Sequence, residues 1–140
     1  MNLEKLRFLK ILTIIFIIFI STNSFSQNIP ITEKNLFGCW THSMEESTRN
    51  DSNEVILVYR PCKFKKFPPL LYRHRIELKD NGQCSWLFLA DDDGHYMVNG
   101  SWLLEKETRV IKIHNLNGSI EKQFKIVDLK NDILNFKEFL

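Results

Sequence analysis

The side chains best suited to chemistry in this sequence are a histidine and the two glutamates that follow it, His42, Glu45 and Glu46. An imidazole and a carboxylate at this spacing bind a metal ion when a helix brings them to one face, whereas an extended strand keeps them apart. The surrounding residues are of the strand type, so the spacing predicts no metal site. We interpret the glutamates as a solvated strand end that can pair with Arg73 or Arg75.

An enzyme would need both glutamates to meet His42, His74 or His95 in one cleft, as in a hydrolase. The sequence contains no Gly-x-Ser-x-Gly elbow that would mark a nucleophilic serine. Cys39 stands close to His42, but the alternation of a strand turns the two side chains to opposite sides. We therefore expect no catalysis and no cofactor, with a His/Glu cleft hydrolase as the exception.

Three adjacent aspartates precede Gly94 and His95 and suggest a calcium loop. A calcium loop of the EF-hand type alternates its acids and adds a distant glutamate, whereas the side chains of the contiguous residues Asp91 to Asp93 diverge. We interpret this segment as a charged hairpin turn. A weak calcium site, completed by His42, is the alternative.

The candidate binding site is a basic and aromatic segment, RPCKFKKFPPLLYRHR, from Arg60 to Arg75. Its prolines stiffen a long connection between two strands, and long loops often carry function. Guanidinium groups suit a carboxylate or phosphate, and burial of apolar surface supplies roughly 25 cal/mol per Å². The predicted ligand-binding residues are Arg60, Phe64, Phe67, Tyr72, Arg73 and Arg75. In the alternative interpretation, Phe64 and Phe67 only pack over a barrel mouth.

The first 26 residues have the profile of a signal peptide. Basic residues precede an apolar run at 11–20, which is too short to span a membrane. Ser24 and Ser26 supply the small residues that a signal peptidase requires, so the mature chain is expected to start at Gln27. We expect a periplasmic or secreted protein that keeps no stable membrane anchor after cleavage.

The charge balance of the remaining chain argues against nucleic acid as a partner. The first 26 residues hold three of the 19 basic and one of the 17 acidic groups, which leaves 16 of each. A chain without net charge has no bulk attraction to nucleic acid or to anionic lipid. A small-molecule ligand or an envelope protein is the expected partner.

Three cysteines, Cys39, Cys62 and Cys84, allow at most one disulfide within a monomer. All three pairings are open, as is a state without any bond. The sequence favours Cys62 with Cys84, because Cys62 lies in a loop beside a proline and is free to approach a strand end. Closing a loop of this size stabilises a fold by roughly 3 kcal/mol in the chain-entropy treatment.

Short strand-like runs separated by turn signals fill the rest of the sequence, so the predicted class is all-β. Asn-Gly and Asp-Gly pairs mark several of the turns, because these residues tolerate the positive φ of tight hairpins. The eight expected strands are Cys39 to Ser43, Glu54 to Arg60, Tyr72 to Lys79, Cys84 to Ala90, His95 to Glu105, Arg109 to His114, Ser119 to Val127 and Ile133 to Glu138.

Side-chain alternation along these runs places one apolar row inside. Tyr72, His74, Ile76 and Leu78 share one face of their strand, for example, and charged residues share the other. A meander of this kind hides both sheet edges by closing into a barrel. We therefore predict an antiparallel eight-stranded up-and-down barrel, with a β-sandwich as the alternative.

The glycine and tryptophan of GCW, Gly38 to Trp40, resemble the Gly-x-Trp start of lipocalins. Together with THSMEE, VYRPCKFKKFPP, DNGQCSWLFLADDDGHY and NGSW, the motif is similar to a family of small exported bacterial lipocalin-like proteins without an assigned activity. The resemblance implies an up-and-down barrel, a binding role, and Trp40 as a plug of the closed end. The expected organisation is a signal peptide at 1–26, an N-terminal extension at 27–35 and a lipocalin-like barrel at 36–140.

These observations lead to one functional hypothesis and one alternative. We expect an exported binding module for a small amphipathic or anionic ligand, without catalysis. The alternative is an envelope structural or interaction module with a filled barrel, whose basic and aromatic loop docks a partner protein.

Overall fold

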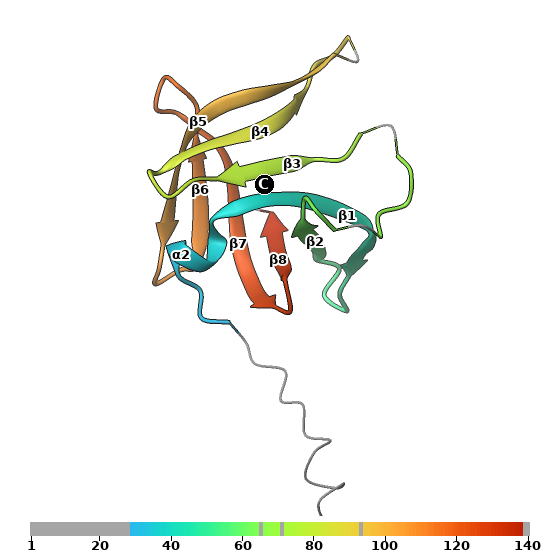
Figure 1. Ribbon diagram of the computed structural model, residues 1–140. Coiled ribbons are helices and arrows are strands. Elements are labelled where there is room, and N and C mark those ends of the chain that lie inside the picture. The colour runs from blue at the N-terminus through green and yellow to red at the C-terminus, as the bar shows by residue number, and fades with distance from the viewer. Residues whose placement is uncertain (1–28, 65, 71, 93, 139–140) are drawn as a thin grey trace, which may run out of the picture.

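A computed structural model describes residues 29–64, 66–70, 72–92 and 94–138 (Figure 1). The predicted signal peptide at 1–26 and the first two residues of the predicted extension lie outside the described residues. Within the described part of the chain, no helix is both long and apolar enough to cross a membrane.

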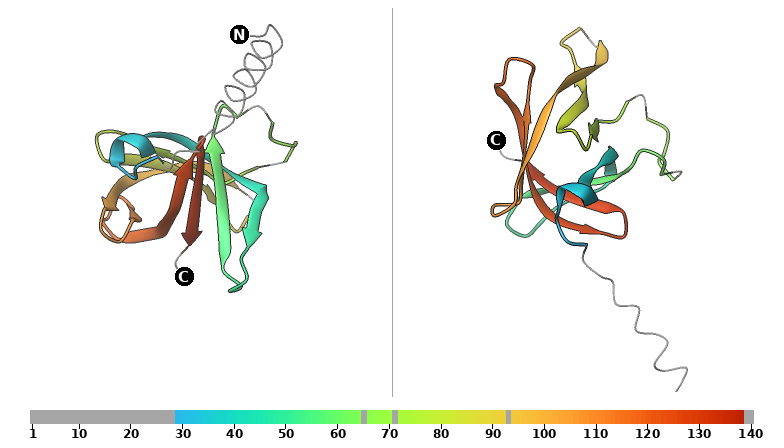
Figure 2. Two further views of the ribbon diagram at one scale, coloured as in Figure 1. Left: turned by 90° about the horizontal axis from the view of Figure 1, so that it is seen from below. Right: turned by 60° about the vertical axis from the view of Figure 1, so that its left-hand side comes forward.

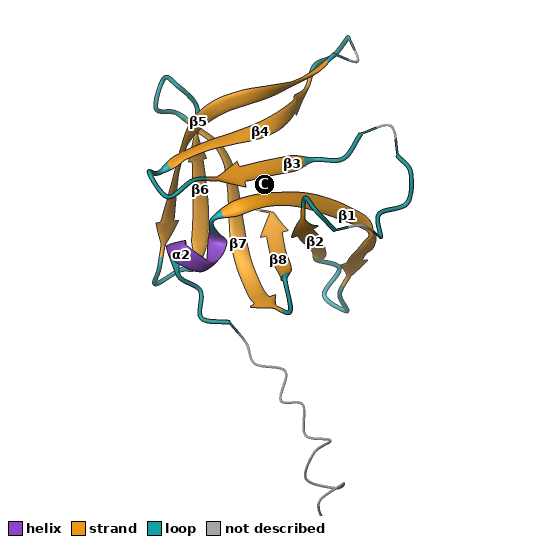
Figure 3. Cartoon of the chain, viewed as in Figure 1, coloured by secondary structure: helices purple, strands orange, loops and turns teal. Residues whose placement is uncertain are grey.

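Eight antiparallel strands close into a barrel in the order β1-β2-β8-β7-β6-β5-β4-β3, which confirms the predicted all-β barrel and excludes the sandwich. Among the described residues, strands dominate and one helical turn precedes them (Figure 3). The elements are α2 (Glu33–Leu36), β1 (Gly38–Arg49), β2 (Val55–Pro61), β3 (Arg75–Leu78), β4 (Gln83–Leu89), β5 (His95–Glu105), β6 (Val110–His114), β7 (Ile120–Lys130) and β8 (Ile133–Glu138).

The first and third strands differ most from the predicted lengths. β1 continues beyond Ser43 to Arg49, and the register of its pairing with β2 shifts on the way. β3 begins only at Arg75, because the residues before it belong to the long connection from β2. The hairpin of β4 and β5 extends beyond β3, as Figures 1 and 2 show.

The hairpin turns carry the residues that tight turns require. Gly82 and Gly118 have positive φ values of 75° and 81°, in the predicted DNG and NLNG turns. Asn131 and Asp132 have φ values of 51° and 58° between β7 and β8, which a short polar side chain tolerates best. The turn chemistry therefore fixes the ends of the strands, as the sequence predicts.

Inward-facing rows from all the strands form one core. Its largest fully buried side chains include Trp86, Phe124 and Phe136. Gly100 makes room for Trp86, because a Cβ atom there would lie 2.9 Å from the tryptophan ring and 2.1 Å from the carbonyl oxygen of His114. A substitution at this position must therefore displace either the ring or the neighbouring strand.

The segment before β1 covers part of this core. Leu36 of α2 is fully buried, and the indole N–H of Trp40 donates to its carbonyl oxygen at 2.9 Å. Ile29 and Ile31 pack against the core, and the Ile29 N–H donates to the carbonyl of Leu129 at 2.9 Å. The described part of the predicted extension is thus attached to the barrel, with Trp40 beneath it.

The predicted disulfide between Cys62 and Cys84 is wrong, because the bond joins Cys39 and Cys62. Trp40 pairs with Pro61 across β1 and β2, so the next step of the ladder sets Cys39 opposite Cys62, with Cα atoms 5.4 Å apart. Cys84 faces the interior instead and is buried in the core, where burial raises the pKa of its thiol to about 11. The disulfide is thus decided by the direction in which each cysteine side chain points from its strand, and not by the freedom of a loop to move.

Candidate functional site: an inward polar cluster

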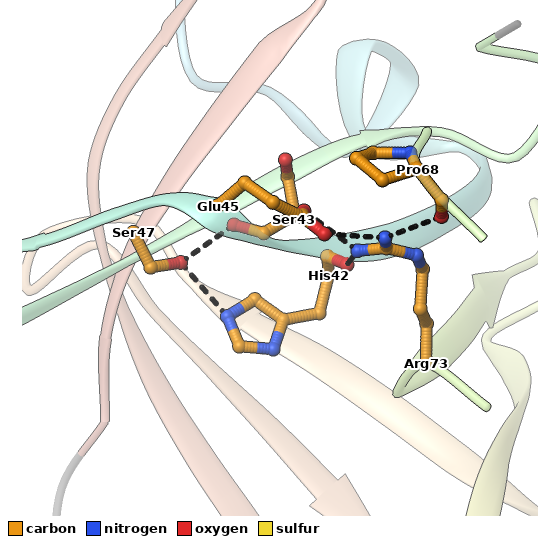
Figure 4. A network of polar contacts seen from close by, with 6 residues as sticks. All are labelled: His42, Ser43, Glu45, Ser47, Pro68 and Arg73. Atoms are coloured by element: carbon orange, nitrogen blue, oxygen red, sulfur yellow. Dashed lines mark hydrogen bonds and ion pairs between the residues drawn. The ribbon is translucent and has the colours of Figure 1, made fainter. Parts of the chain in front are cut away.

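The candidate site lies beside a wide bulge in β1, between Ser43 and Thr48. Ser43 pairs with Val58 and Thr48 with Ile56, so β1 takes more residues than β2 to cover the same distance. Ser47, within the bulge, replaces part of the missing ladder with its hydroxyl group. That hydroxyl donates to the carbonyl of Ser43 at 2.8 Å (Figure 4). It also accepts from the Val58 N–H at 3.1 Å.

The same hydroxyl lies 2.8 Å from Nε2 of His42. A serine hydroxyl has one proton and two lone pairs, and the proton and one lone pair are already in use. Nε2 of His42 therefore carries a proton and donates it to Ser47. The hydroxyl proton and both lone pairs of Ser47 are therefore in hydrogen bonds, so the hydroxyl stabilises the bulge and is not activated as a nucleophile.

Two further inward rings join His42. Tyr59 pairs with His42 across β1 and β2, and the two rings stack with centroids 5.2 Å apart. The hydroxyl of Tyr59 lies 2.9 Å from Nδ1 of His74, the residue before β3. Tyr59 also contacts the buried rings of Phe124 and Phe136, so the polar cluster rests directly on the core.

Burial keeps His74 neutral. Desolvation, and to a smaller degree the nearby charges of Lys122 and His42, lower the pKa of His74 to about 4. A phenol is a better donor than acceptor, so we expect Tyr59 to donate to Nδ1 and the His74 proton to sit on Nε2. Nε2 is buried and has no hydrogen-bond partner among the described residues.

A second buried donor and a cation also face the interior of the barrel. Nε1 of Trp86 is likewise without a partner in the described part of the chain. Lys122 shares the inward row of β7 with Phe124 and Ile126, and it pairs with the buried Ile113 of β6. A buried donor without a hydrogen bond lowers the stability of the fold by about 1–3 kcal/mol. Two such donors that face the same interior therefore suggest a place for a ligand acceptor.

Four of the six predicted binding residues gather on the outer wall of the barrel. Arg60 lies 4.7 Å from the ring centroid of Phe64, and Arg73 lies 4.8 Å from that of Phe67. The two phenylalanine rings meet edge to face at 5.1 Å. Arg60 follows the inward Tyr59, so alternation turns it outward, and the loop therefore packs against the outside of β1 and β2.

Both of these arginines are engaged by glutamates of the β1 bulge. Arg60 forms a two-bond ion pair with Glu46. Arg73 forms a two-bond ion pair with Glu45 and also donates to the carbonyl of Pro68 (Figure 4). The hydrogen bonds from Arg73 hold the pKa of Glu45 at about 2. The interpretation of the glutamates as partners of basic residues is confirmed for Glu45 with Arg73, and Arg60 takes Glu46.

The remaining predicted residues lie elsewhere. Tyr72 stacks on His95 with centroids 5.8 Å apart, and Arg75 donates from Nε to Sγ of Cys39 at 2.8 Å. The structure thus divides the predicted set among three places, and ligand binding by these six residues stays a prediction. Sequence reasoning missed Ser47, Tyr59 and Lys122, although alternation along their strands could have placed the latter two inside.

The histidines and glutamates of the hydrolase alternative also lie apart. His42 and His74 flank Tyr59, whereas His95 stacks on Tyr72. The ring of His42 points away from the carboxylate of Glu45 (Figure 4). Among the described residues, no group of three histidine, cysteine or acidic side chains could hold a metal ion.

Comparisons with protein-family models, with curated proteins and with solved structures find no match for this chain. The geometry of the barrel and of the inward polar cluster, His42, Tyr59, His74, Trp86 and Lys122, therefore carries the functional argument alone.

Proposed function

We propose that this protein is a non-enzymatic binding module, and that it holds the acidic end of a small amphipathic molecule at the inward polar cluster. The observation that carries the proposal is Nε2 of His74, a buried donor without a partner in the described part of the chain. An acceptor atom of a ligand would satisfy it. The unpartnered indole N–H of Trp86 adds a second donor in the same interior.

The charge of the interior favours an anion as the ligand head. Lys122 is close enough to depress the pKa of His74, so it adds positive potential where the donors lie. Charge-assisted hydrogen bonds to an anion are about twice as strong as neutral ones. A carboxylate therefore fits this cluster better than a neutral or cationic group.

Aromatic side chains supply an apolar environment for the remainder of such a molecule. Phe88 and Tyr96 meet on the projecting hairpin with centroids 5.5 Å apart, and Tyr96 is exposed, whereas Phe124 and Phe136, which contact Tyr59, are already buried in the core. Burial of an alkyl chain against such rings is favourable by about 0.8 kcal/mol per methylene group. The ligand class is thus the one that the sequence predicts, with its polar end moved from the outer arginines to the inward cluster.

Export and family membership belong to the same proposal. We infer that residues 1–26 direct the chain out of the cytoplasm and that the mature protein is lipocalin-like, periplasmic or secreted. The Cys39–Cys62 disulfide is compatible with an oxidising compartment. Amino-terminal sequencing of the protein from its own host tests the cleavage, with Gln27 as the expected first residue.

Three probes with the same twelve-carbon chain test the ligand class. Laurate, dodecanol and dodecyltrimethylammonium are titrated below their micellar concentrations, with tryptophan fluorescence and calorimetry as readouts. We expect laurate to bind at least tenfold more tightly than the other two, since one charge-assisted hydrogen bond is worth about 1.5–3 kcal/mol. Equal binding of all three probes, or binding of none, would contradict the proposal.

Two matched variants locate the site. Lys122→Gln removes the inward cation, whereas Lys125→Gln removes an exposed cation from the opposite face of the same strand. The first should weaken laurate binding about tenfold and the second should leave it unchanged. An equal effect of both changes would place the binding elsewhere on the surface.

The second candidate is an envelope interaction module that docks a partner protein. Large apolar side chains near the outer loop favour it, because Met44 and Leu70 are 56% and 50% exposed. Crosslinking in the host, with a photoreactive group at position 70, tests it directly. Recovery of a defined envelope protein would support this candidate, and recovery of small molecules alone would count against it.

A further inference from the structure

The disulfide borders a surface pocket that the proposed ligand site does not use. Cys39 and Cys62 line this pocket of ≈610 Å³ together with Lys63 and Arg75. Both cysteines alternate with inward residues, so their sulfur atoms lie on the outer side of the barrel wall. The pocket is large enough to bring a small molecule to the sulfur atoms without unfolding the barrel.

The two sulfur atoms have different neighbours. The guanidinium of Arg75 donates from Nε to Sγ of Cys39 at 2.8 Å, whereas the neutral hydroxyl of Thr41 donates to Sγ of Cys62 at 3.2 Å. A cation beside a sulfur atom lowers the pKa of the thiol and stabilises its thiolate. Cys39 is therefore the better leaving group of the pair.

Two acidic residues, Glu77 and Asp132, lie near the bond. Glu77 pairs with Cys39 across β1 and β3. Its carboxylate accepts a hydrogen bond at 3.4 Å from the hydroxyl of Ser85, which lies on β4, the other neighbour of β3. Asp132 also lines the pocket. Among the described residues, the charged side chain that forms a hydrogen bond to the disulfide is Arg75, and its partner is Sγ of Cys39.

We propose that the Cys39–Cys62 bond is an exchange site for small anionic thiols. The thiolate of the small molecule attacks Sγ of Cys62, the disulfide breaks, and its electron pair leaves on Sγ of Cys39 beside Arg75. A second thiolate then attacks the small-molecule sulfur of the mixed disulfide and releases Cys62. Two thiols are oxidised to one disulfide, and the protein takes up their two electrons and two protons as a dithiol.

The charge of the pocket selects the thiol. Lys63 and Arg75 attract an anionic group attached to the attacking sulfur, in the way that basic clefts steer charged substrates. 2-Mercaptoethanesulfonate, 2-mercaptoethanol and cysteamine are matched probes with anionic, neutral and cationic groups. Their rates are compared after correction for the thiolate fraction of each.

The test follows reduction of the folded, oxidised protein under native conditions, by alkylation of the released thiols and mass measurement. We expect the sulfonate to react fastest, and we expect Arg75→Gln to slow it about three- to tenfold through the poorer leaving group. Arg75→Lys, which retains a cation, should recover part of the rate. Arg49→Gln is the matched control, because Arg49 is an exposed arginine of β1 that contacts Asn53.

Peptide mapping tests the direction of attack. Trypsin places the three cysteines in different peptides, 35–49, 50–63 and 80–106. After an acid quench, the adduct should be found on Cys62, with Cys39 alkylated. An adduct on Cys39, a rate that Arg75→Gln does not change, or resistance to all three thiols before unfolding would each overturn the proposal. Circular dichroism confirms that each variant is folded.

Discussion

The hydroxyl of Tyr59 lies 2.9 Å from Nδ1 of His74, and this contact ties β2 to the start of β3 across the inner side of β1. It also fixes the orientation of the imidazole, so that Nε2 remains for another partner. The position of His74 thus depends on a residue that is only 2% exposed and packed into the core.

Replacing Tyr59 by phenylalanine removes the hydroxyl and leaves the ring. We expect Tyr59→Phe to lower the free energy of unfolding by about 1–2 kcal/mol, because it deprives the buried imidazole of a partner. Urea denaturation followed by tryptophan fluorescence measures the change. Tyr96→Phe, at a residue that is 55% exposed, is the control and should have almost no effect.

The pKa of His74 predicts a loss of stability in mild acid. His74 titrates near 4 when folded and near 6.5 when unfolded, so below pH 6.5 the unfolded chain binds the extra proton. The free energy of unfolding therefore keeps its full value above pH 6.5 and decreases as the pH falls from 6.5 to about 4. The loss is about 3 kcal/mol, or less where local opening admits water.

Variants at position 74 separate this contribution from those of the glutamates. The pKa values of Glu46, Glu54 and Glu105 are lowered from 4.5 by their basic partners, so their stabilisation is lost mainly below pH 4.5. His74→Phe and His74→Gln should flatten the dependence of unfolding free energy on pH between 6.5 and 4.5. An unchanged slope in both variants would show that His74 is not the titrating group.

The Arg73–Glu45 pair should hold the outer loop against the barrel. Lys63 and Lys66 are exposed trypsin sites within that loop. We expect Arg73→Met to accelerate cleavage there several-fold, because the loop loses its bonds to Glu45 and to the carbonyl of Pro68. Arg49→Met is the control, and equal cleavage rates in the two variants would argue against this role of Arg73.

The core leaves no room for a side chain at Gly100. Gly100→Ala should destabilise the protein by about 1–3 kcal/mol, because the added Cβ meets the Trp86 ring and the His114 carbonyl. Gly94→Ala is a suitable control, since a Cβ atom there comes closest to the side chain of the exposed Asp92. Thermal unfolding of both variants measures the difference, and similar melting temperatures would contradict the packing described.

Most of the fold could be predicted from the sequence because two-residue alternation and turn residues act locally. The strands His95–Glu105 and Ile133–Glu138 have the bounds that the alternation predicts. β1 was predicted too short, since a bulge interrupts alternation and its missing ladder contact is supplied by Ser47. No local pattern reveals that the hydroxyl of Ser47 will accept from the backbone N–H of Val58 on the neighbouring strand.

The candidate site was less predictable, because it depends on which faces meet across the barrel. Four of the six predicted binding residues lie together, yet the glutamates of the β1 bulge hold their two arginines on the outer wall, and Tyr72 and Arg75 lie elsewhere. The disulfide depends on the register of β1 and β2, which sets Cys39 beside Cys62. His74, just before β3, and Lys122 of β7 are far apart in the sequence, yet the charge of Lys122 lowers the pKa of His74, and no spacing rule connects the two residues.

The proposed function requires His74 to donate from Nε2 to the acidic end of a bound molecule. Nitrogen-15 NMR of the imidazole side chains, recorded while laurate is added to the folded protein, tests this claim most directly. We expect a protonated Nε2 on a neutral His74 whose resonance shifts as laurate binds, with a weaker response in Lys122→Gln. Saturable binding of laurate that leaves the His74 resonances unchanged would contradict it.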